Sequence, residues 1–400
     1  MTISPPSSEE NEKIKSLFEN IKSVSQAREL FPVTKTCIYI DSAHYSQYSL
    51  ETYRRLTNFI HEFTFTNKNL SLFNFRLAEQ LRGICAELIN ADKDETIITT
   101  SATHGLNIFV NGLDLQKGDK VAFADSEFPA VVYPWLNQEK LKGVECVYIP
   151  SKNGVIKFED IESILRNNKI KALTISSVEF LGYRNNIEKI GKLCKETGTL
   201  FVVDAIQSMG IIPLDVKKIP EIDFLAAGAQ KWLQAPSGIG FAYIPKRNRK
   251  LIHPSFIGTM SIKYDFKNFL DYKLNFADDG QAYENSTLNC LGMIGLQSTI
   301  ELFMKLGVEN IFEHITNLLN IFIANIKDTN FNIESSLEPE HRSNILIFSH
   351  SDMSKNEFVQ KELEKKNIFI ALREGFLRIS PHIFNNEEDI LTLCKELKKF

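Results

Sequence analysis

Residues Asp223–Ile244 read DFLAAGAQKWLQAPSGIGFAYI, and this stretch holds a lysine in an unusual setting. Lys231 lies between two apolar runs that are typical of buried strands, directly before Trp232 and a turn rich in Pro and Gly. An amine at the end of a buried strand loses hydration, which lowers its pKa and frees its lone pair to form a Schiff base with an aldehyde. Most lysines beside apolar runs simply extend to water, so this stretch alone does not identify a catalytic residue.

A carboxylate occupies a related position upstream. The segment Leu200–Val216 reads LFVVDAIQSMGIIPLDV, and Asp204 directly follows four apolar residues that favour strands. This pattern predicts the carboxyl end of a buried parallel strand, where open α/β sheets bind ligands. There Asp204 can keep the ring nitrogen of a pyridinium protonated, and Gln207 can reach a ring substituent. Pyridoxal phosphate needs such a pair, because one anion makes the ring an electron sink and one amine carries the aldehyde.

Three ordered motifs together resemble a known family. VVDAIQSMGIIPLDV, DFLAAGAQKWL and PSGIGFAYI are similar to segments of the class V aminotransferase group of fold-type I pyridoxal phosphate enzymes. This group includes cysteine desulfurases and isopenicillin N epimerase-like proteins. The resemblance runs from IYIDSAH near residue 40 to LRISPHIFNNEEDI near the C-terminus. It implies pyridoxal 5'-phosphate as the cofactor and catalytic roles for Lys231, Asp204 and Arg378.

The remaining pattern predicts an α/β fold. Short β-rich runs alternate with helical ones, which indicates βαβ units around a mainly parallel sheet. The runs are TIITT, VAFA, VECVYI, ALTIS, LFVV, FLAA and IGFAYI. Together with the resemblance, they predict fold type I, with a mainly parallel seven-stranded sheet, helices on both faces and a smaller α+β domain. We expect residues 38–290 to form the large cofactor-binding domain, 291–400 the small C-terminal domain, and 1–37 a segment that joins the small domain.

Composition narrows the classes of partner and compartment. A net charge of −4 indicates neither nucleic acid nor an acidic membrane as a partner. Six cysteines are scattered without a CxxC pair, so neither a metal site nor a disulfide scaffold is expected. The N-terminus has no apolar signal segment, and no run of about 18 apolar residues occurs. We therefore expect a cytoplasmic protein that is not attached to a membrane.

A turn in TTSATHGLNIFVNGL is the expected site of the cofactor phosphate. Small residues at a helix N-terminus expose backbone N–H groups where the helix dipole favours an anion. The resemblance implicates Ala102, Thr103 and His104, whereas an ordinary N-cap by Ser101 or Thr103 is the alternative. Further cofactor contacts are implied for Ser177 and Gln230. Gln230 replaces the histidine that relatives usually carry, and Gly228 replaces a common phosphate-binding serine, which suggests weaker phosphate contacts here.

Two further cofactor contacts follow from the resemblance. Phe128, in SEFPAVVYPW, occupies the position whose aromatic ring covers the cofactor ring in relatives, although a plain core phenylalanine is the alternative. YENSTLNCLGMIGL resembles the segment in which a threonine reaches the phosphate of the neighbouring subunit. That residue is Thr287, and its role implies a homodimer with a shared active site.

Two arginines near the C-terminus are candidates for substrate binding. A guanidinium pairs bidentately with a carboxylate, as an α-amino acid substrate requires. The resemblance places Arg378 at the substrate carboxylate and Arg373 nearby, with a surface ion pair to Glu374 or another neighbour as the alternative for Arg373. His44, in DSAHYSQ, is a candidate second proton donor, or a polar residue that caps a helix start.

The sequence leaves the reaction open. Cysteine desulfurases need a nucleophilic cysteine on a loop before the arginine that matches Arg378, and here that interval is EGFL. Persulfide transfer is therefore not expected. We expect a Lys231 Schiff base that supports transamination or elimination at the α-carbon of a small amino acid. The alternatives are an epimerase of the isopenicillin N epimerase type and a non-catalytic descendant of the fold. His44, Tyr45, Tyr183 and the loop at about residues 255–285 are candidates for setting specificity.

Overall fold

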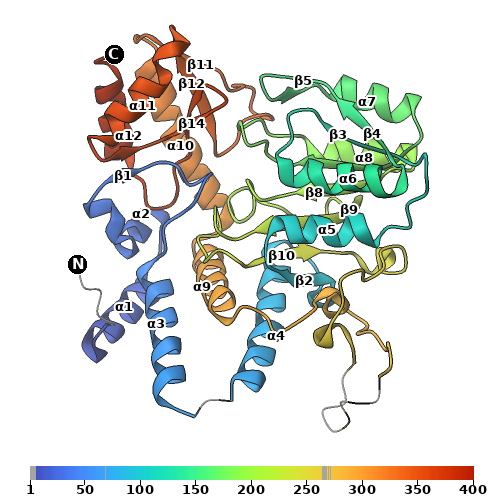
Figure 1. Ribbon diagram of the computed structural model, residues 1–400. Helices are drawn as coiled ribbons and strands as arrows, with labels where there is room; N and C mark the ends of the chain where they lie inside the picture. Colours follow the sequence, from blue (N-terminus) through green and yellow to red (C-terminus); the bar gives the residue numbers. More distant parts are fainter. Residues whose placement is uncertain (1–5, 68, 264–267, 269, 271) are drawn as a thin grey trace.

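The computed structural model describes residues 6–67, 69–263, 268, 270 and 272–400. A large sheet carries helices on both faces, and a smaller sheet with its own helices lies beside it (Figure 1). The strands of the large sheet are β2 (Thr96–Thr99), β3 (Lys120–Ala124), β4 (Glu145–Ile149), β7 (Ile170–Ser176), β8 (Leu200–Asp204), β9 (Ile222–Gly228) and β10 (Gly240–Tyr243).

The large sheet has the order β2-β10-β9-β8-β7-β3-β4. Strand β10 runs antiparallel to both of its neighbours, and the other pairs are parallel. The seven apolar runs of the sequence are these seven strands, so the predicted mainly parallel sheet is confirmed. Crossover connections, through helices except between β8 and β9 among the described elements, bring the carboxyl ends of the parallel strands to one edge.

Alternation along the strands sends side chains into two separate cores. In β8, Phe201 and Val203 pack on one face of the sheet, and Val202 packs on the other. The face of Val202 is covered by α5 (Ala102–Gly112) and α6 (Pro129–Lys142). The opposite face is covered by α4 (Leu70–Leu88), α7 (Phe158–Asn167), α8 (Ile187–Thr197) and α9 (Cys290–Leu306). The predicted helices on both faces are therefore confirmed.

The smaller sheet is antiparallel and has the order β11-β12-β15-β14. Its strands are β11 (Phe331–Ile333), β12 (Leu346–His350), β14 (Ala371–Arg373) and β15 (Phe376–Ile379). The helices nearby are α10 (Val308–Ile326), α11 (Asn356–Glu364) and α12 (Glu387–Leu397). A separate β-hairpin, which the sequence analysis did not predict, consists of β5 (Ser151–Lys152) and β6 (Val155–Ile156).

The N-terminal segment is attached to the C-terminal part of the chain. It contains α1 (Ser8–Asn20), α2 (Val24–Ala27) and β1 (Ile38–Tyr39), and α3 (Leu50–Phe65) follows. Strand β1 pairs in parallel with β13 (Ile368–Phe369), and Arg28 forms an ion pair with Asp389 at 2.8 Å. Helix α9 packs against α3 and α4, whereas α10 packs against α12. The division at residues 37/38 and 290/291 stays a prediction.

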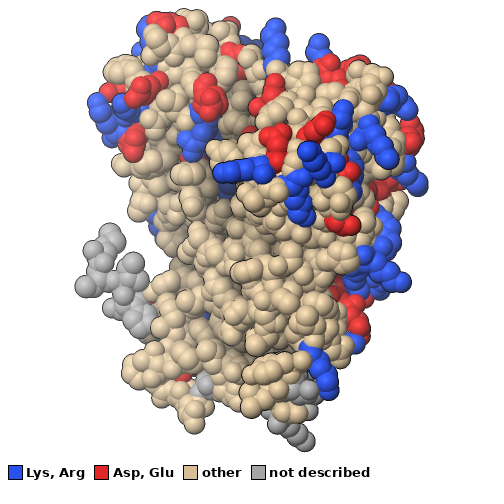
Figure 2. Space-filling view, turned by 45° about the vertical axis from the view of Figure 1, so that its right-hand side comes forward, with Lys and Arg blue, Asp and Glu red and all other residues tan. Residues whose placement is uncertain are grey.

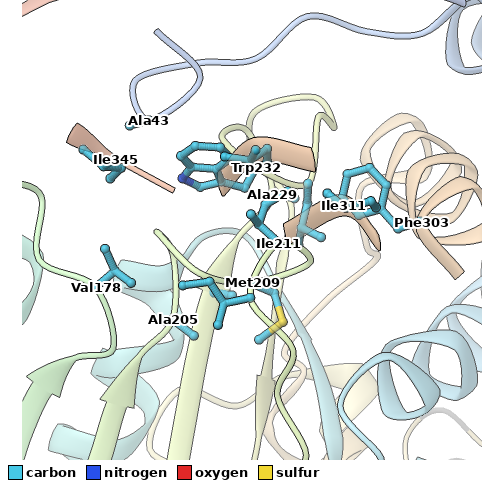
Figure 3. Close-up of a cluster of buried hydrophobic side chains, with 14 of the residues drawn as sticks. Ala43, Val178, Ala205, Met209, Ile211, Ala229, Trp232, Phe303, Ile311 and Ile345 are labelled. Carbon is cyan, nitrogen blue, oxygen red and sulfur yellow. The ribbon is translucent and has the colours of Figure 1, made fainter. Parts of the chain in front are cut away.

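A cluster of buried apolar side chains lies directly behind the lysine turn. Trp232 is fully buried, and Figure 3 shows its side chain close to Ala229 and Ile211. Phe303 of α9 and Ile311 of α10 lie to the right of it in this view. The Trp232 indole N–H donates to Gln207 Oε1 at 2.8 Å. This packing fixes the chain on the carboxyl side of Lys231, so the lysine itself has little freedom of backbone position.

Candidate active site

A tight turn after β9 presents Lys231. The N–H of Ala235 donates to the carbonyl of Ala229 at 3.0 Å, and the N–H of Gln234 donates to the carbonyl of Lys231 at 3.1 Å. Gln234 has a φ of 46°, a left-handed conformation that is uncommon for this residue type. The turn thus holds Lys231 at the carboxyl edge of the sheet, near the end of β8.

Lys231 and Asp204 carry opposite charges in a desolvated setting, and each charge affects the pKa of the other group. Asp204 is 2% exposed, and its Oδ1 accepts a hydrogen bond from the N–H of Ile206 at 2.9 Å. Burial raises the pKa of Asp204 to about 6, against the opposing effects of the Ile206 hydrogen bond and the positive charge of Lys231. Burial lowers the pKa of Lys231 to about 8, although Asp204 opposes this shift. The amine is therefore partly uncharged near neutral pH, as a nucleophile must be.

The shifted pKa of Lys231 predicts how its reactivity depends on pH. In the cofactor-free protein, acylation of Lys231 is expected to rise with a midpoint near pH 8, below the ordinary lysine pKa of 10.5, because burial disfavours the ammonium form. Mass spectrometry after brief labelling between pH 6 and 10 measures this midpoint, with the exposed Lys250 as the reference in the same sample. Equal midpoints for the two lysines would contradict the account.

An aromatic ring forms one wall of the site. The Lys231 Nζ lies 5.3 Å from the centre of the Phe128 ring, and this ring is 46% exposed. Phe128 meets Phe180 edge-on, with ring centres 6.1 Å apart. A core phenylalanine would not remain half exposed beside a lysine amine, so the geometry favours the predicted covering role over the core alternative.

The start of α5 and the end of β9 form a cradle for an anion. Ser101 caps the helix by accepting from the His104 N–H at 3.1 Å, while helix geometry leaves the N–H groups of Ala102 and Thr103 without an acceptor inside the helix. A Cβ added at Gly228 would lie 2.8 Å from Gln230 Oε1 and 3.3 Å from the Ala102 nitrogen. Only glycine therefore leaves the space between the helix start and Gln230 open.

His104 adds a ring nitrogen to this region. Its Nδ1 accepts from the Thr100 N–H at 3.2 Å, and its Nε2 is buried without a hydrogen-bond partner among the described residues. Burial lowers the pKa of His104, so the ring is neutral at physiological pH. A neutral ring whose Nδ1 accepts has its proton on Nε2, which leaves one donor for a bound group.

Two predicted cofactor contacts are occupied by protein groups. The Gln207 amide donates to the carbonyl of Ala43 at 3.2 Å and accepts from Trp232. The Ser177 hydroxyl lies 2.6 Å from the Ser208 hydroxyl and 3.2 Å from the carbonyl oxygen of Asp204. Both side chains brace the strand end under Asp204, and their direct contact with a cofactor stays a prediction.

Arg378 is buried and already paired. One terminal nitrogen donates to Asp41 Oδ1 at 3.1 Å, and the other donates to the carbonyl of Phe180 at 3.0 Å. Its Nε is buried and has no partner among the described residues. Burial lowers the pKa of Arg378, and Asp41 opposes this shift. No role was predicted for Asp41. Its position directly after the apolar run Ile38–Ile40 is the sequence feature that could have identified it as a site residue.

Arg373 lies on the same face of the small sheet as Arg378. Arg373 pairs with Phe376 across the β14–β15 hairpin, two positions from Arg378. Its guanidinium donates only to the carbonyl of Leu372, at 2.8 Å, among its hydrogen bonds in the described part of the chain. The ion pair with Glu374 that we considered as an alternative is not formed, so Arg373 has its charge available.

Three other predicted residues lie in different settings. The His44 Nδ1 is 3.6 Å from Asp41 Oδ2, its side chain is 53% exposed, and burial lowers its pKa. Thr287 is exposed in a bend before α9. Tyr183 stacks on His341 with ring centres 4.6 Å apart. In the loop at about residues 255–285, positions 264–267, 269 and 271 lie outside the described residues.

The hairpin before Arg378 is as short as a hairpin can be. Glu374 and Gly375, with φ of 48° and 82°, form a two-residue turn between β14 and β15. This turn carries no cysteine. Cys394 is buried, whereas Cys290 is only partly buried and its sulfur contacts Asn74 Nδ2 at 2.8 Å.

The described residues contain neither a cluster suited to a metal ion nor a helix suited to span a membrane. Among residues 6–67, 69–263, 268, 270 and 272–400, no three or more His, Cys, Asp or Glu side chains are grouped to hold a metal ion. Within these same ranges, every helix is too short or too polar to cross a membrane.

Two buried glutamates near Asp204 were missed by the sequence analysis. Glu127 lies just after β3 and Glu179 just after β7, and both are buried. Each follows a strand end by three residues, so the rule that selected Asp204 would have selected them had it included the first turn of the following loop.

The sequence of this chain is similar to those of known proteins. A family model described as Aminotransferase class-V matches residues 38–393. A probable cysteine desulfurase of Pyrococcus abyssi is 28% identical over 337 residues, which are 80% of this chain and 82% of that protein. A kynureninase of Bacillus anthracis is 26% identical over 339 residues, which are 81% of this chain and 78% of that protein.

Solved structures share the fold. The apo cysteine desulfurase of Thermococcus onnurineus NA1 has a TM-score of 0.84 at 23% identity and covers 95% of this chain and 98% of its own. A C-DES variant with glycine covalently linked to its PLP cofactor has a TM-score of 0.85 at 21% identity, covering 93% of this chain and 99% of its own. At these identities the likeness shows a common fold.

Proposed function

Because this chain belongs to the class V aminotransferase family and is an enzyme whose cofactor is pyridoxal 5'-phosphate, we propose that it acts at the α-carbon of a small amino acid. The reaction is a transamination or an elimination. The observation that supports this proposal best is the Lys231 amine beside the Phe128 ring. Burial lowers the pKa of this amine to about 8, although the negative charge of Asp204 opposes the shift.

The residues present fit this cofactor. A phosphate would fit the open space at Gly228. The N–H groups at the start of α5 have no acceptor inside the helix, and His104 Nε2 has no partner among the described residues, so both can donate to the phosphate. Gln230 borders the same space. Asp204, as a buried anion, suits a ring nitrogen that carries a proton. When bound, pyridoxal phosphate supplies an aldehyde that forms a Schiff base with an amine and a ring that takes up electrons.

Lys231 and the two arginines are proposed to act on different groups of the substrate. Lys231 is proposed to hold the cofactor covalently and then, as a free amine, to remove or return the proton at the α-carbon. Arg378 is proposed to bind the substrate carboxylate. The two terminal nitrogens of Arg378 are engaged by Asp41 and Phe180. Arg373, whose guanidinium donates only to the Leu372 carbonyl among the described residues, is therefore proposed to supply the second half of the carboxylate site.

Amino-acid screening with product analysis tests the proposed reaction. The protein loaded with pyridoxal phosphate is incubated with L- and D-amino acids, with and without a 2-oxo acid as amino acceptor. Consumption that depends on the 2-oxo acid indicates transamination, and release of ammonia without an acceptor indicates elimination. If the α-hydrogen of no tested amino acid exchanges with deuterium from solvent, action at the α-carbon is wrong.

Epimerisation is the second candidate, and His44 is the residue that favours it. An epimerase needs a proton donor on the face opposite Lys231. His44 lies beside Asp41, the partner of Arg378, with its Nδ1 3.6 Å from Asp41 Oδ2. Formation of the other enantiomer, lost in His44→Gln while deuterium exchange continues, would distinguish this reaction.

A desulfurase reaction is not proposed, although relatives such as the Pyrococcus abyssi protein carry that name. The two-residue turn of Glu374 and Gly375 contains no cysteine and is too short to bring one to the site.

The six cysteines of this chain form no disulfide bonds, which is consistent with the cytoplasmic location that we propose. A non-catalytic descendant would have no use for a desolvated lysine facing a buried aspartate.

Filling the anion cradle is expected to weaken cofactor binding. In Gly228→Val, the new side chain occupies the space between the Ala102 nitrogen and Gln230, so affinity for pyridoxal phosphate should fall at least about tenfold, or about 1.4 kcal/mol. Absorbance titration with the cofactor measures this loss. Gly83→Val, at a helix position where only the end of Lys93 comes within 4.0 Å, is the control. Equal affinities in the two variants would refute the cradle.

We further propose a homodimer that completes the site. Large apolar side chains are exposed toward the projecting ends of α3 and α4, and Figure 2 shows few charged side chains over the lower part of one face. They include Ile60, Phe63, Phe65, Leu72 and Phe75. Exposed apolar side chains gathered at the ends of two neighbouring helices are typical of an interface between subunits. Thr287 is exposed, as a residue that reaches a neighbouring subunit must be.

Mixing two inactive variants tests whether Thr287 acts across subunits. Co-expressed Lys231→Ala and Thr287→Asp chains form mixed dimers in which one site has an intact Lys231 and an intact Thr287 from its partner. Activity should then return to about one quarter of the wild-type value per site, because half of the dimers are mixed and each has one intact site. No recovery would contradict a shared site.

A further inference from the structure

Two buried glutamates lie at the carboxyl edge of the large sheet, beside Asp204. Glu127 is 7% exposed and Glu179 is fully buried. Glu179 follows β7, which pairs with β8 so that Ser176 is opposite Asp204. Three carboxyl groups therefore share one desolvated region, and the mechanism above uses only that of Asp204.

The hydrogen bonds of the two glutamates do not balance two negative charges. Glu127 accepts from the N–H and the hydroxyl of Ser176, each at 2.6 Å. Glu179 accepts from Asn185 Nδ2 at 2.8 Å through Oε1, and its Oε2 has no partner among the described residues. In the same part of the chain, neither carboxyl forms an ion pair with a lysine, arginine or histidine. Two uncompensated carboxylates in such a setting would be very costly, so a proton is retained.

The three carboxyl groups differ in how readily they ionise. Lys231 counteracts the effect of burial on Asp204, whose pKa is about 6. Burial raises the pKa of Glu127 to about 7, and Asp204 adds to this shift. Burial and the neighbouring charges of Glu127 and Asp204 raise the pKa of Glu179 well above its usual range. Asp204 therefore ionises first and Glu179 last.

The two glutamates are also next to the aromatic wall and the arginine. Phe128 directly follows Glu127, and Phe180 directly follows Glu179. The rings of these phenylalanines meet edge-on, and the carbonyl of Phe180 accepts from Arg378 at 3.0 Å. The two glutamates thus lie next in sequence to the residues that form the wall beside Lys231 and bind the Arg378 guanidinium.

We propose that Glu127 and Glu179 are positioning residues that together keep one proton at neutral pH, so that the buried negative charge facing Lys231 stays on Asp204 while Phe128 and Phe180 keep their places. Their role in catalysis rests on the function proposed above. Their shared proton does not, since it follows from the cofactor-free structure.

Infrared spectroscopy of the cofactor-free protein tests the shared proton directly. The C=O stretch of a protonated carboxylic acid is recorded between pH 5 and 9 for the wild type, Glu127→Gln, Glu179→Gln and Asp204→Asn. Glu188→Gln, which changes an exposed carboxylate on α8, is the control. Because no cofactor is present, failure of the proposed reaction would leave this result unaffected.

We expect a carboxylic acid band that persists at pH 8 in the wild type and the control and is lost in Glu179→Gln. In Glu127→Gln and Asp204→Asn the band should disappear at least about one pH unit lower than in the wild type, because a negative neighbour that raises the pKa of Glu179 is removed. If Glu179→Gln does not fold, this shift decides alone. Absence of a band at pH 7, or a band whose pH midpoint none of these variants moves, overturns the proposal.

A second measurement connects the pair with the site. In the cofactor-loaded protein, the visible absorbance of Glu179→Gln is titrated with acid and base beside the wild type. Since the substitution replaces a neutral acid by a neutral amide, the pH midpoint of the absorbance change should move by less than about 0.3 pH units. A larger shift would show that Glu179 carries charge in the wild type, which would overturn the proposal.

Discussion

Replacing Lys231 by alanine is expected to lower kcat by at least about 10²–10⁴-fold, the usual contribution of a positioned acid or base. The loss has two causes, because Lys231 is proposed both to hold the cofactor and to move the α-proton. Folding should be retained, since the variant removes an amine whose charge burial already disfavours. Steady-state kinetics with the amino acid identified by screening, together with circular dichroism, measure both effects.

Two controls give this result its meaning. Lys250→Ala removes an exposed lysine and should leave kcat unchanged. Adding a small primary amine to Lys231→Ala should recover part of the lost rate, because the amine replaces the missing proton acceptor. A Lys231→Ala enzyme that turns over at the wild-type rate would contradict the assignment.

Replacing Arg378 by alanine is expected to destabilise the protein by about 3–5 kcal/mol, the typical effect of removing one partner of a buried ion pair. The Arg378 side chain is 2% exposed and that of Asp41 is 12% exposed, so the carboxylate of Asp41 would lose its partner in a largely dry setting. The free hydrogen-bond acceptor at the Phe180 carbonyl adds to the cost. Denaturant unfolding measures this change.

The double variant Arg378→Ala/Asp41→Asn separates the charge effect from lost packing. It should recover part of the stability, because no unpaired carboxylate remains. Equal stability of the single and double variants would show that the ion pair contributes nothing. Arg373→Ala is the matched comparison. Within the described part of the chain the Arg373 guanidinium has only the Leu372 carbonyl as a hydrogen-bond partner, so stability should change little while KM rises.

Most of the sheet could be predicted from the sequence because each strand is a short apolar run with turn residues at its ends. Asp204 and Lys231 followed from the same pattern, since polar side chains at strand ends stand out against apolar neighbours. The antiparallel direction of β10 could not be predicted this way, because an apolar run has no direction.

Contacts between distant segments were beyond sequence patterns. The Arg378–Asp41 ion pair joins residues that are 337 positions apart, and nothing local marks either as the other's partner. The same holds for the Phe180 carbonyl that accepts from Arg378. Gln207 was predicted to contact the cofactor, yet its amide lies between Trp232 and Ala43, which only the folded packing reveals.

Locating the covalent bond to the cofactor shows whether Lys231 carries it. The purified protein is incubated with pyridoxal phosphate, its visible spectrum is recorded, and the complex is reduced with borohydride, digested and analysed by mass spectrometry, with Lys231→Ala treated in parallel. The account predicts a yellow wild-type protein and a reduced cofactor attached to Lys231, with neither in the variant. A wild type that stays colourless, or a cofactor attached equally to other lysines in both proteins, would contradict it.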